Sequence, residues 1–267
     1  QFFFLVAAIN FRHFFSLLAS FLNFFVSKIT QFFVTQILRL RFLLWQRGGH
    51  TLYVGGPASI AEELGEVYSA RGARAFDYAF LGEKIYRHPF RVVHCSAGEV
   101  PGACERPQAL GRQLSGCRIG FDLGASDYKV AAVVDGETIF SEETPWAPVV
   151  QEDPEYHYAA IKLAIEKAVA QLPRVDAIGG SAAGIYVDSE PRVASLFRGI
   201  PEERFDAVRG LFRRIGDELG IPITVVNDGE VTALAGSMSL GDNRVLGIAL
   251  GSSEAGGYVT ADGGITD

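Results

Sequence analysis

Cysteine and methionine are scarce in this sequence, and their scarcity limits the kinds of protein it can be. Cys95, Cys104 and Cys117 are odd in number and form no Cys-x-x-Cys pair. Such thiols provide neither a disulfide framework nor the usual spacing of zinc ligands, so we expect reduced cysteines and a cytoplasmic protein. The single methionine is Met238, and the chain begins at Gln1. The numbering therefore does not start at a natural initiator.

Basic residues are also too few for a nucleic-acid partner to be expected. The formal net charge is -7, with 24 Lys and Arg against 31 Asp and Glu, whereas phosphate backbones select for basic surfaces. The common nucleotide motifs are absent as well. The sequence contains no G-x-x-x-x-G-K-[ST] loop and no G-x-G-x-x-G opening a βαβ unit. A small anionic ligand held by backbone dipoles remains open.

Acidic residues are missing altogether from residues 1–47, which hold 12 of the 20 phenylalanines and five basic residues. A spanning helix needs about 20 apolar residues, and Lys28 interrupts the apolar stretch. Three interpretations stay open: a membrane anchor, a signal-like leader, or a segment foreign to the folded domain. Contact with a membrane is expected only if this segment is a genuine anchor. We leave it out of the functional argument.

In the remaining sequence, turn and loop residues separate predicted helices and strands, as in an ordinary globular protein. Residues 48–116 carry equal numbers of acidic and basic residues, and we expect a cap or linker that includes a helix over 58–70. Beyond residue 117 the pattern predicts strands at 118–123, 129–134, 137–141, 177–180 and 223–226, helices at 154–172, 202–219 and 230–239, and a hairpin of 245–250 with 257–260. The order βββαβαβα followed by ββ predicts an α/β fold, with a mixed sheet and helices on both of its faces.

The first of three polar turns is DLGASDYKV, residues 122–130. Gly124, Ala125 and Ser126 are small enough for backbone N–H groups to approach phosphate oxygens. Ser126 adds a hydroxyl and Lys129 a cation, while Asp122 could hold Mg²⁺ through water. The alternative is a turn that only joins two strands.

The second polar turn is VVNDGEVTALAG, residues 225–236, where a strand delivers Asn227 and Asp228 to the start of a helix. A carboxylate there can accept a proton from a sugar hydroxyl, and the amide can orient the same sugar. The alternative is that either side chain simply caps the helix.

The third turn is LGSSEAGG, residues 250–257, where Gly251, Ser252 and Ser253 could wrap the outer phosphates. Glycine-rich hairpins are common, so this turn alone is weakly specific.

Taken together, these motifs resemble those of the ROK and hexokinase sugar kinases of the actin-like ATPase superfamily, from about Arg118 to the end of the chain. In the first turn Ala125, Ser126 and Lys129 stand where Gly, Thr and Arg are usual. The segment IGGSAAGIYVD, residues 178–188, is similar to the family's segment before the sugar site, with Ala183 where Pro is frequent.

The resemblance implies a role for each matched residue. Asp228 would be the general base, and Asn227, Ser181 and Gly184 would bind the sugar. The residues that would bind ATP are Asp122, Gly124, Ala125, Ser126, Lys129, Gly251, Ser252 and Ser253, with Mg²⁺ at Asp122. In the third turn, Glu254 would place a negative charge near phosphate.

The implied fold is a ribonuclease H-like lobe over 117–240, followed by the start of a second lobe over 241–267. The implied activity is ATP-dependent phosphorylation of a hexose or related sugar, with ATP and Mg²⁺ as cofactors and a homodimer as an option. The alternative is a non-catalytic sugar-sensing regulator of the ROK type. The family's adenosine motif, and the His and Cys cluster that binds zinc in many ROK members, would lie beyond Asp267.

Overall fold

The computed structural model describes residues 35–102, 107–251 and 254–265. The chain divides into two compact units, residues 1–52 and 53–267. In the first unit, residues 35–47 are helical, and the rest of the Phe-rich segment lies outside the described residues. None of the helices in the described ranges is both long enough and apolar enough to cross a membrane.

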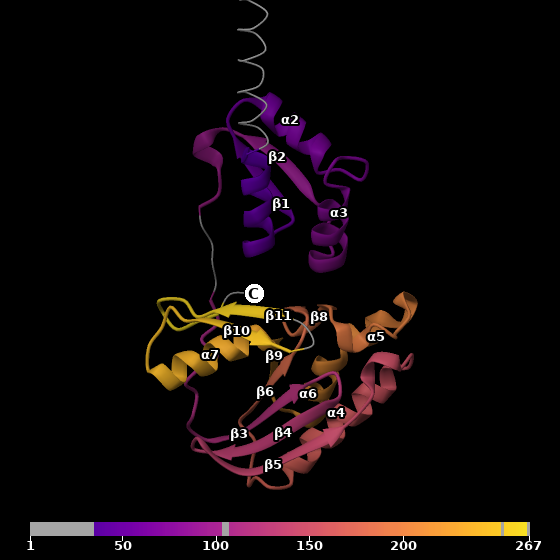
Figure 1. The fold of residues 1–267 in the computed structure, drawn as a ribbon, viewed down its shortest axis with the longest axis vertical. Helices are drawn as coiled ribbons and strands as arrows, with labels where there is room; N and C mark the ends of the chain where they lie inside the picture. Colours follow the sequence, from indigo (N-terminus) through magenta and orange to yellow (C-terminus); the bar gives the residue numbers. More distant parts are fainter. Residues whose placement is uncertain (1–34, 103–106, 252–253, 266–267) are drawn as a thin grey trace, which may run out of the picture. The chain divides into compact units, whose positions relative to one another are not determined.

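A small β-sheet region occupies residues 51–99 (Figure 1). It consists of strands β1 (Thr51–Gly55) and β2 (Arg91–Cys95), the helices α2 (Ala58–Val67) and α3 (Ala75–Asp77), a π-helix η1 (Tyr78–Tyr86) and a 3₁₀ turn η2 (Ala97–Glu99). The predicted helix over 58–70 is confirmed as α2, whereas the two strands and the π-helix were not predicted.

The centre of the second unit is a five-stranded mixed sheet with the strand order β5-β4-β3-β6-β9. Its strands are β3 (Cys117–Leu123), β4 (Asp127–Val134), β5 (Glu137–Pro145), β6 (Ala177–Ala182) and β9 (Ile223–Asn227). β3 is antiparallel to β4 and parallel to β6, which in turn is parallel to β9. The predicted mixed sheet is therefore confirmed.

Turn chemistry and helix capping fix the local structure around this sheet. Asp135 and Gly136 both have positive φ, 50° and 88°, as a two-residue hairpin turn between β4 and β5 requires. Helix α4 (Pro154–Val169) begins with proline in its first turn, and the Asp153 side chain accepts a hydrogen bond from the Glu155 amide. The sequence signals for the hairpin and for this helix start are thus correct.

The single helix predicted over 202–219 is wrong in detail. A 3₁₀ turn η5 (Glu202–Arg204) leads into α5 (Phe205–Arg209), and the chain then breaks at Gly210 before α6 (Leu211–Leu219). Glycine in a helix interior is disfavoured by backbone entropy. The predicted end at Gly220 is confirmed, because that residue adopts the left-handed conformation of a C-terminal cap.

Further short elements, which the sequence did not reveal, lie before and after α4. The 3₁₀ turn η3 (Pro148–Val150) precedes α4. A hairpin of β7 (Ile185–Val187) and β8 (Glu190–Val193) follows β6, and the 3₁₀ turn η4 (Ser195–Phe197) comes after it. β7 and β8 pair in antiparallel fashion over three residue pairs, with one shift of register between Ile185 and Tyr186.

The main hydrophobic core lies between one face of the sheet and the helices α4, α5 and α6. Along β3, buried and less buried residues alternate, so Ile119 and Phe121 face this core while Gly120 and Asp122 face the other way. Phe121 stacks on Phe212 of α6, with their ring centroids 6.0 Å apart.

Helices lie on both faces of the sheet, as predicted, but the second face is covered only in part. Among the described residues, this face contacts α7 (Asp228–Leu240) at β6 and β9. Its middle is the floor of an open groove. Glycines at positions 120 and 179 pair across β3 and β6 there, and a Cβ atom on either would meet nothing within 4 Å.

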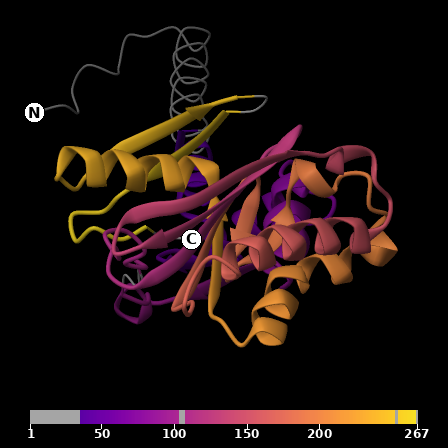
Figure 2. The same cartoon turned by 90° about the horizontal axis from the view of Figure 1, so that it is seen from below.

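Helix α7 lies beside the hairpin of β10 (Leu246–Leu250) and β11 (Glu254–Tyr258), as Figure 2 shows at the yellow end of the chain. A second, smaller hydrophobic core lies around α7. Its buried residues are Val226, Ala233, Leu234, Val259 and Ile265. The close approach depends on glycine, because a Cβ on Gly257 would lie 2.3 Å from the Glu230 Cα. The predicted hairpin is confirmed, but its second strand, predicted at 257–260, runs from Glu254 to Tyr258.

Candidate functional site

Three side chains from three parts of the sequence meet at one edge of the sheet. Asp122 and Ser181 are register partners near the C-terminal ends of the parallel strands β3 and β6. Ser181 pairs in turn with Val226, and Asp228 follows two residues later. Because parallel strands share the direction of their C-terminal ends, these polar groups gather at the same edge. Asp122, Ser181 and Asp228 all line one groove of about 1320 Å³.

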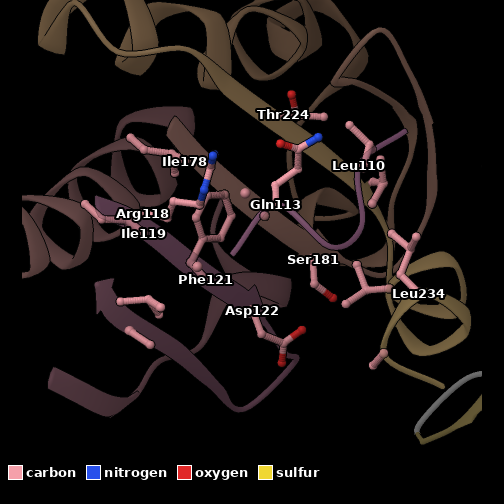
Figure 3. A pocket seen from close by; sticks show the side chains of 18 of the residues that line it. Leu110, Gln113, Arg118, Ile119, Phe121, Asp122, Ile178, Ser181, Thr224 and Leu234 are labelled. Carbon is pink, nitrogen blue, oxygen red and sulfur yellow. The ribbon is translucent and has the colours of Figure 1, made fainter. Parts of the chain in front are cut away.

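The rest of the groove exposes mostly apolar surface, although the charged residues Arg118, Lys129 and Glu143 also line it. Its lining includes Leu110 and Leu114 from the segment before β3 and Leu234 and Met238 from α7. Figure 3 shows Asp122 and Ser181 among these lining residues. A few converging polar groups on an otherwise apolar concave surface are typical of small-molecule sites.

Asn227 has the capping role that the sequence left as an alternative. The Asn227 side-chain Oδ1 accepts a hydrogen bond from the Gly229 backbone N–H at 2.8 Å. The Asn227 backbone N–H donates to Glu230 Oε2 at 3.1 Å. Its Nδ2 donates to the Gly184 carbonyl at 2.6 Å. These bonds hold the start of α7 against the segment that follows β6. A role in sugar binding stays a prediction.

Gly184 lies where only glycine fits. Its φ is 138°, and a Cβ atom would lie 2.5 Å from the Val193 carbonyl oxygen. The conformation directs the Gly184 carbonyl to the Asn227 amide and so sets the path into β7.

Asp228 is the first residue of α7, and its side chain is half-buried. Its Oδ1 accepts a hydrogen bond from the Gly229 amide at 3.1 Å. The positive end of the helix dipole favours a carboxylate at this position. The side chain lies in the lining of the groove, where a carboxylate is placed to accept a proton from a ligand.

Tyr186 is a neighbour of this carboxylate that sequence reasoning missed. Its hydroxyl is buried and, within the described part of the chain, has no hydrogen-bond partner. Burial raises the pKa of Tyr186, and the negative charge of Asp228 raises it further. The only hint in the sequence is a phenol on an otherwise apolar strand.

The first predicted phosphate turn is a compact and well-fixed structure. Gly124 donates its N–H to the Asp127 carbonyl at 2.9 Å, and a Cβ on Gly124 would lie 2.8 Å from that oxygen. Trp146 closes the turn from outside, because its Nε1 donates to the Gly124 carbonyl at 2.8 Å and its amide to the Ser126 carbonyl at 3.0 Å. Ala125 and Ser126 thus lie between β3 and β4, outside the β-ladder.

The Asp127 carboxylate binds two side chains, Ser126 and Lys129, for which the sequence analysis predicted a role in phosphate binding. Ser126 Oγ donates to Asp127 Oδ2 at 2.8 Å, and Lys129 Nζ donates to Asp127 Oδ1 at 2.5 Å. The hydrogen bond from Lys129 lowers the pKa of Asp127, and the hydrogen bond from Ser126 lowers it further. The bond to Asp127 in turn raises the pKa of Lys129. Asp127 was not among the predicted site residues, although it lies inside the motif.

The third turn is described only at its ends. Gly251 is exposed after β10, and Glu254 begins β11. Ser252 and Ser253 lie outside the described residues. Over the described ranges, no group of three or more His, Cys, Asp or Glu residues is placed to hold a metal ion. Magnesium bound through water at Asp122 stays a prediction, and Cys95 and Cys117 are free thiols.

No family model matches the sequence, and no curated protein matches it. Several solved structures do. A ROK hexokinase from Thermus thermophilus is 21% identical, with a TM-score of 0.43, 56% of this chain covered and 47% of that one. A glucokinase from Parabacteroides distasonis is 19% identical, with a TM-score of 0.43 and coverages of 58% and 47%. The chain resembles ROK-family proteins.

One of these matches is a regulator rather than a kinase. It is a ROK-family transcriptional regulator described as a homologue of the E. coli MLC protein, 21% identical, with a TM-score of 0.46, 57% of this chain covered and 38% of that one. The chain thus spans about half or less of the length of these three structures. At these identities the resemblance concerns the fold alone.

Proposed function

We propose that this chain carries the sugar-binding and phosphate-binding part of a sugar kinase, which transfers the terminal phosphoryl group of ATP to a hydroxyl of a hexose or related sugar. One observation carries the proposal. Asp122, Ser181 and Asp228 come from separate strand ends and line a single groove. Structural capping alone would explain Asp228, but it would not explain why the three polar groups share one surface.

Each residue then has a definable task. Asp228 accepts the proton of the attacking sugar hydroxyl, while Asn227 and Ser181 orient the sugar beside it. Asp122 holds Mg²⁺ through water, as an oxygen ligand at the strand end. In the turn after β3, Ala125 and Ser126 offer backbone N–H groups to the phosphates, while the Gly124 N–H keeps the turn compact by donating to the Asp127 carbonyl. Magnesium, when bound, neutralises charge on the transferred group.

The experiment is the substitution Asp228→Asn in the complete protein. It preserves the shape of the side chain and an acceptor for the Gly229 amide, but it removes the proton acceptor. We expect turnover to fall by about 10² to 10⁴ with little change in KM for the sugar. Thermal unfolding serves as the control. A variant with a lowered Tm but unchanged turnover would show that Asp228 serves only the helix start.

The second candidate function is a non-catalytic sugar-sensing regulator on the same fold. The observation that favours it is the binding of Ser126 and Lys129 to Asp127, which engages both side chains internally. Calorimetry with hexose and with Mg-ATP separates the two functions. The regulator should bind hexose and leave it unmodified in the presence of Mg-ATP, whereas the kinase should produce a sugar phosphate.

A further inference from the structure

The floor of the groove is a row of small residues that crosses the sheet from β5 to β9. Gly120 on β3 is the register partner of Ala131 on β4 and of Gly179 on β6. Ala131 pairs in turn with Ser141, and Gly179 pairs with Thr224. All five residues line the groove. Because neighbouring strands lie about 4.8 Å apart, this small-residue row is roughly 19 Å long.

The opposite face of the same strands carries large side chains, such as Ile119 of β3, Ile178 of β6 and Val225 of β9 in the main core. Parallel strands that are covered on both faces read as nearly continuous runs of such residues. Glycine inside a strand weakens it and often marks the close approach of a ligand or of another backbone. A Cβ on Gly120 or Gly179 would meet nothing within 4 Å, so no described backbone fills this space.

Polar side chains lie directly beside the small-residue row. Asp122 and Ser181 are register partners two residues beyond Gly120 and Gly179, so they point to the same face of the sheet. Ser181 is only 7% exposed, and its hydroxyl forms no hydrogen bond with any residue that the structure describes. Figure 3 shows it among the side chains that line the groove. A buried hydroxyl without a partner is costly, and a ligand hydroxyl in the groove would satisfy it.

The groove offers more room and more apolar surface than a hexose can use. Its volume of about 1320 Å³ exceeds the range of about 300 to 1,000 Å³ that is typical of small-molecule pockets. A hexose carries hydroxyl groups around its whole ring, so it matches the polar side chains but not the apolar ones. The apolar side chains that line the groove include Leu110, Leu114, Leu234 and Met238. The groove therefore fits a ligand that joins a polar part to an apolar part.

We propose that the substrate is a glycoside, a hexose that carries a flat apolar ring, with the hexose at Asp122, Ser181 and Asp228 and the ring on the small-residue row. This inference rests on the proposed function, because it names the substrate class of the same site. The ring lies flat against the backbone of Gly120 and Gly179, where no side chain intervenes. Its binding energy comes from apolar surface that leaves water. The hexose hydroxyls stay beside the buried Ser181 hydroxyl and the Asp228 carboxylate.

The test is calorimetric binding of paired ligands to the full chain. Each pair consists of the phenyl and the methyl glycoside of one hexose in the same anomeric form, with glucose, mannose and galactose as the hexoses. The two members of a pair differ only in the ring. We expect the phenyl glycoside of at least one pair to bind about tenfold more tightly than its methyl partner.

Glycine substitutions locate the ring. Gly179→Val fills the floor of the groove without a clash at Cβ, and it should bring the two affinities of the pair to within about twofold of each other. The matched control is Gly256→Val on β11, outside the groove, where a Cβ would lie 3.9 Å from the Gly247 carbonyl oxygen. The control should keep the preference for the phenyl glycoside. Thermal unfolding checks both variants, and Gly120→Val replaces Gly179→Val if the latter fails to fold.

Two results would overturn the proposal: equal affinities within every pair, or a phenyl preference that the folded groove variants retain. A hexose phosphorylation assay with Mg-ATP keeps this question separate from the proposed function. Phosphorylation of a hexose without any preference for its phenyl glycoside would support the kinase and refute the glycoside. A phenyl preference that Gly179→Val abolishes, with no phosphorylation of any of these sugars, would support the ring site and refute the kinase.

Discussion

At the scale of single residues, the burial of His157 makes the stability of the fold depend on pH. It is fully buried in α4, and its Nε2 lies 3.0 Å from the Pro148 carbonyl and 3.2 Å from the Leu196 carbonyl. The ring also packs against Trp146 and Phe197. This side chain joins the start of α4 to the turns on either side of it, so its protonation state affects the whole junction.

Burial lowers the pKa of His157 below its usual value of 6.5. A lowered pKa means that the fold prefers the neutral ring. Stability is therefore complete above the unfolded pKa and is lost as the pH falls from about 6.5 through the folded pKa. We expect the Tm to drop by about 2–4 °C for each kcal/mol lost on acidification. His157→Gln should remove this part of the pH dependence, as measured by thermal unfolding between pH 7.5 and 5.

The matched control for that measurement is His94→Gln. His94 is exposed at the end of β2 and contacts the Gly56 carbonyl. Its replacement should leave the acid dependence of the Tm intact. An unchanged acid dependence in His157→Gln would assign the effect to other groups.

At the scale of elements, β6 presents two adjacent glycines to opposite faces of the sheet. A Cβ on Gly180 would lie 2.2 Å from the Phe121 ring, whereas one on Gly179 would meet nothing within 4 Å. Gly180→Ala should therefore destabilise the fold by about 1–3 kcal/mol, because it overpacks the core. Gly179→Ala should be nearly neutral. Chemical denaturation of the two variants measures the difference, and similar losses would mean that both faces are covered.

The same glycines show what could and could not be predicted from the sequence. Local signals worked: apolar alternation revealed β3, Asp135-Gly136 revealed the hairpin, and Pro154 marked the start of α4. These features depend on neighbours in the chain. The β7 and β8 hairpin was missed because its strands are short and its turn, at Asp188 and Ser189, uses two non-glycine residues with positive φ.

The residues of the candidate site also divide into those that the sequence could predict and those that it could not. Asp122 and Asp228 could be selected in advance, because strand ends of a parallel sheet gather at one edge, whereas Ser181 was suggested only by the resemblance to the sugar kinases. The engagement of Ser126 and Lys129 by Asp127 could not be selected, because residue type alone does not reveal which side chain satisfies which donor. Tyr186 escaped for a related reason, since its nearness to Asp228 arises only when the hairpin folds back.

At the scale of the whole molecule, two separate cores support the site. The larger core fixes Asp122 and Ser181 through the sheet, and the smaller one fixes α7 against the β10 and β11 hairpin. Arg112, in the segment before β3, donates to the Ser237 and Asp242 carbonyls at the end of α7. Gln108 and Ile265 pair through two backbone hydrogen bonds. Asp228 thus starts a helix that is held at both ends, which fixes the backbone position of this residue beside the groove.

The division of the chain at Leu52 predicts the effect of removing the Phe-rich segment. Deletion of residues 1–47 leaves β1 intact, because that strand begins at Thr51. We expect residues 48–267 to keep a cooperative thermal transition within a few degrees of the full chain, since both described cores lie beyond residue 116. A second truncation that starts at Ala58 also removes β1, the partner of β2, and should expose the region around α2 to proteolysis. Loss of cooperativity already in the first truncation would show that residues 1–47 stabilise the folded domain.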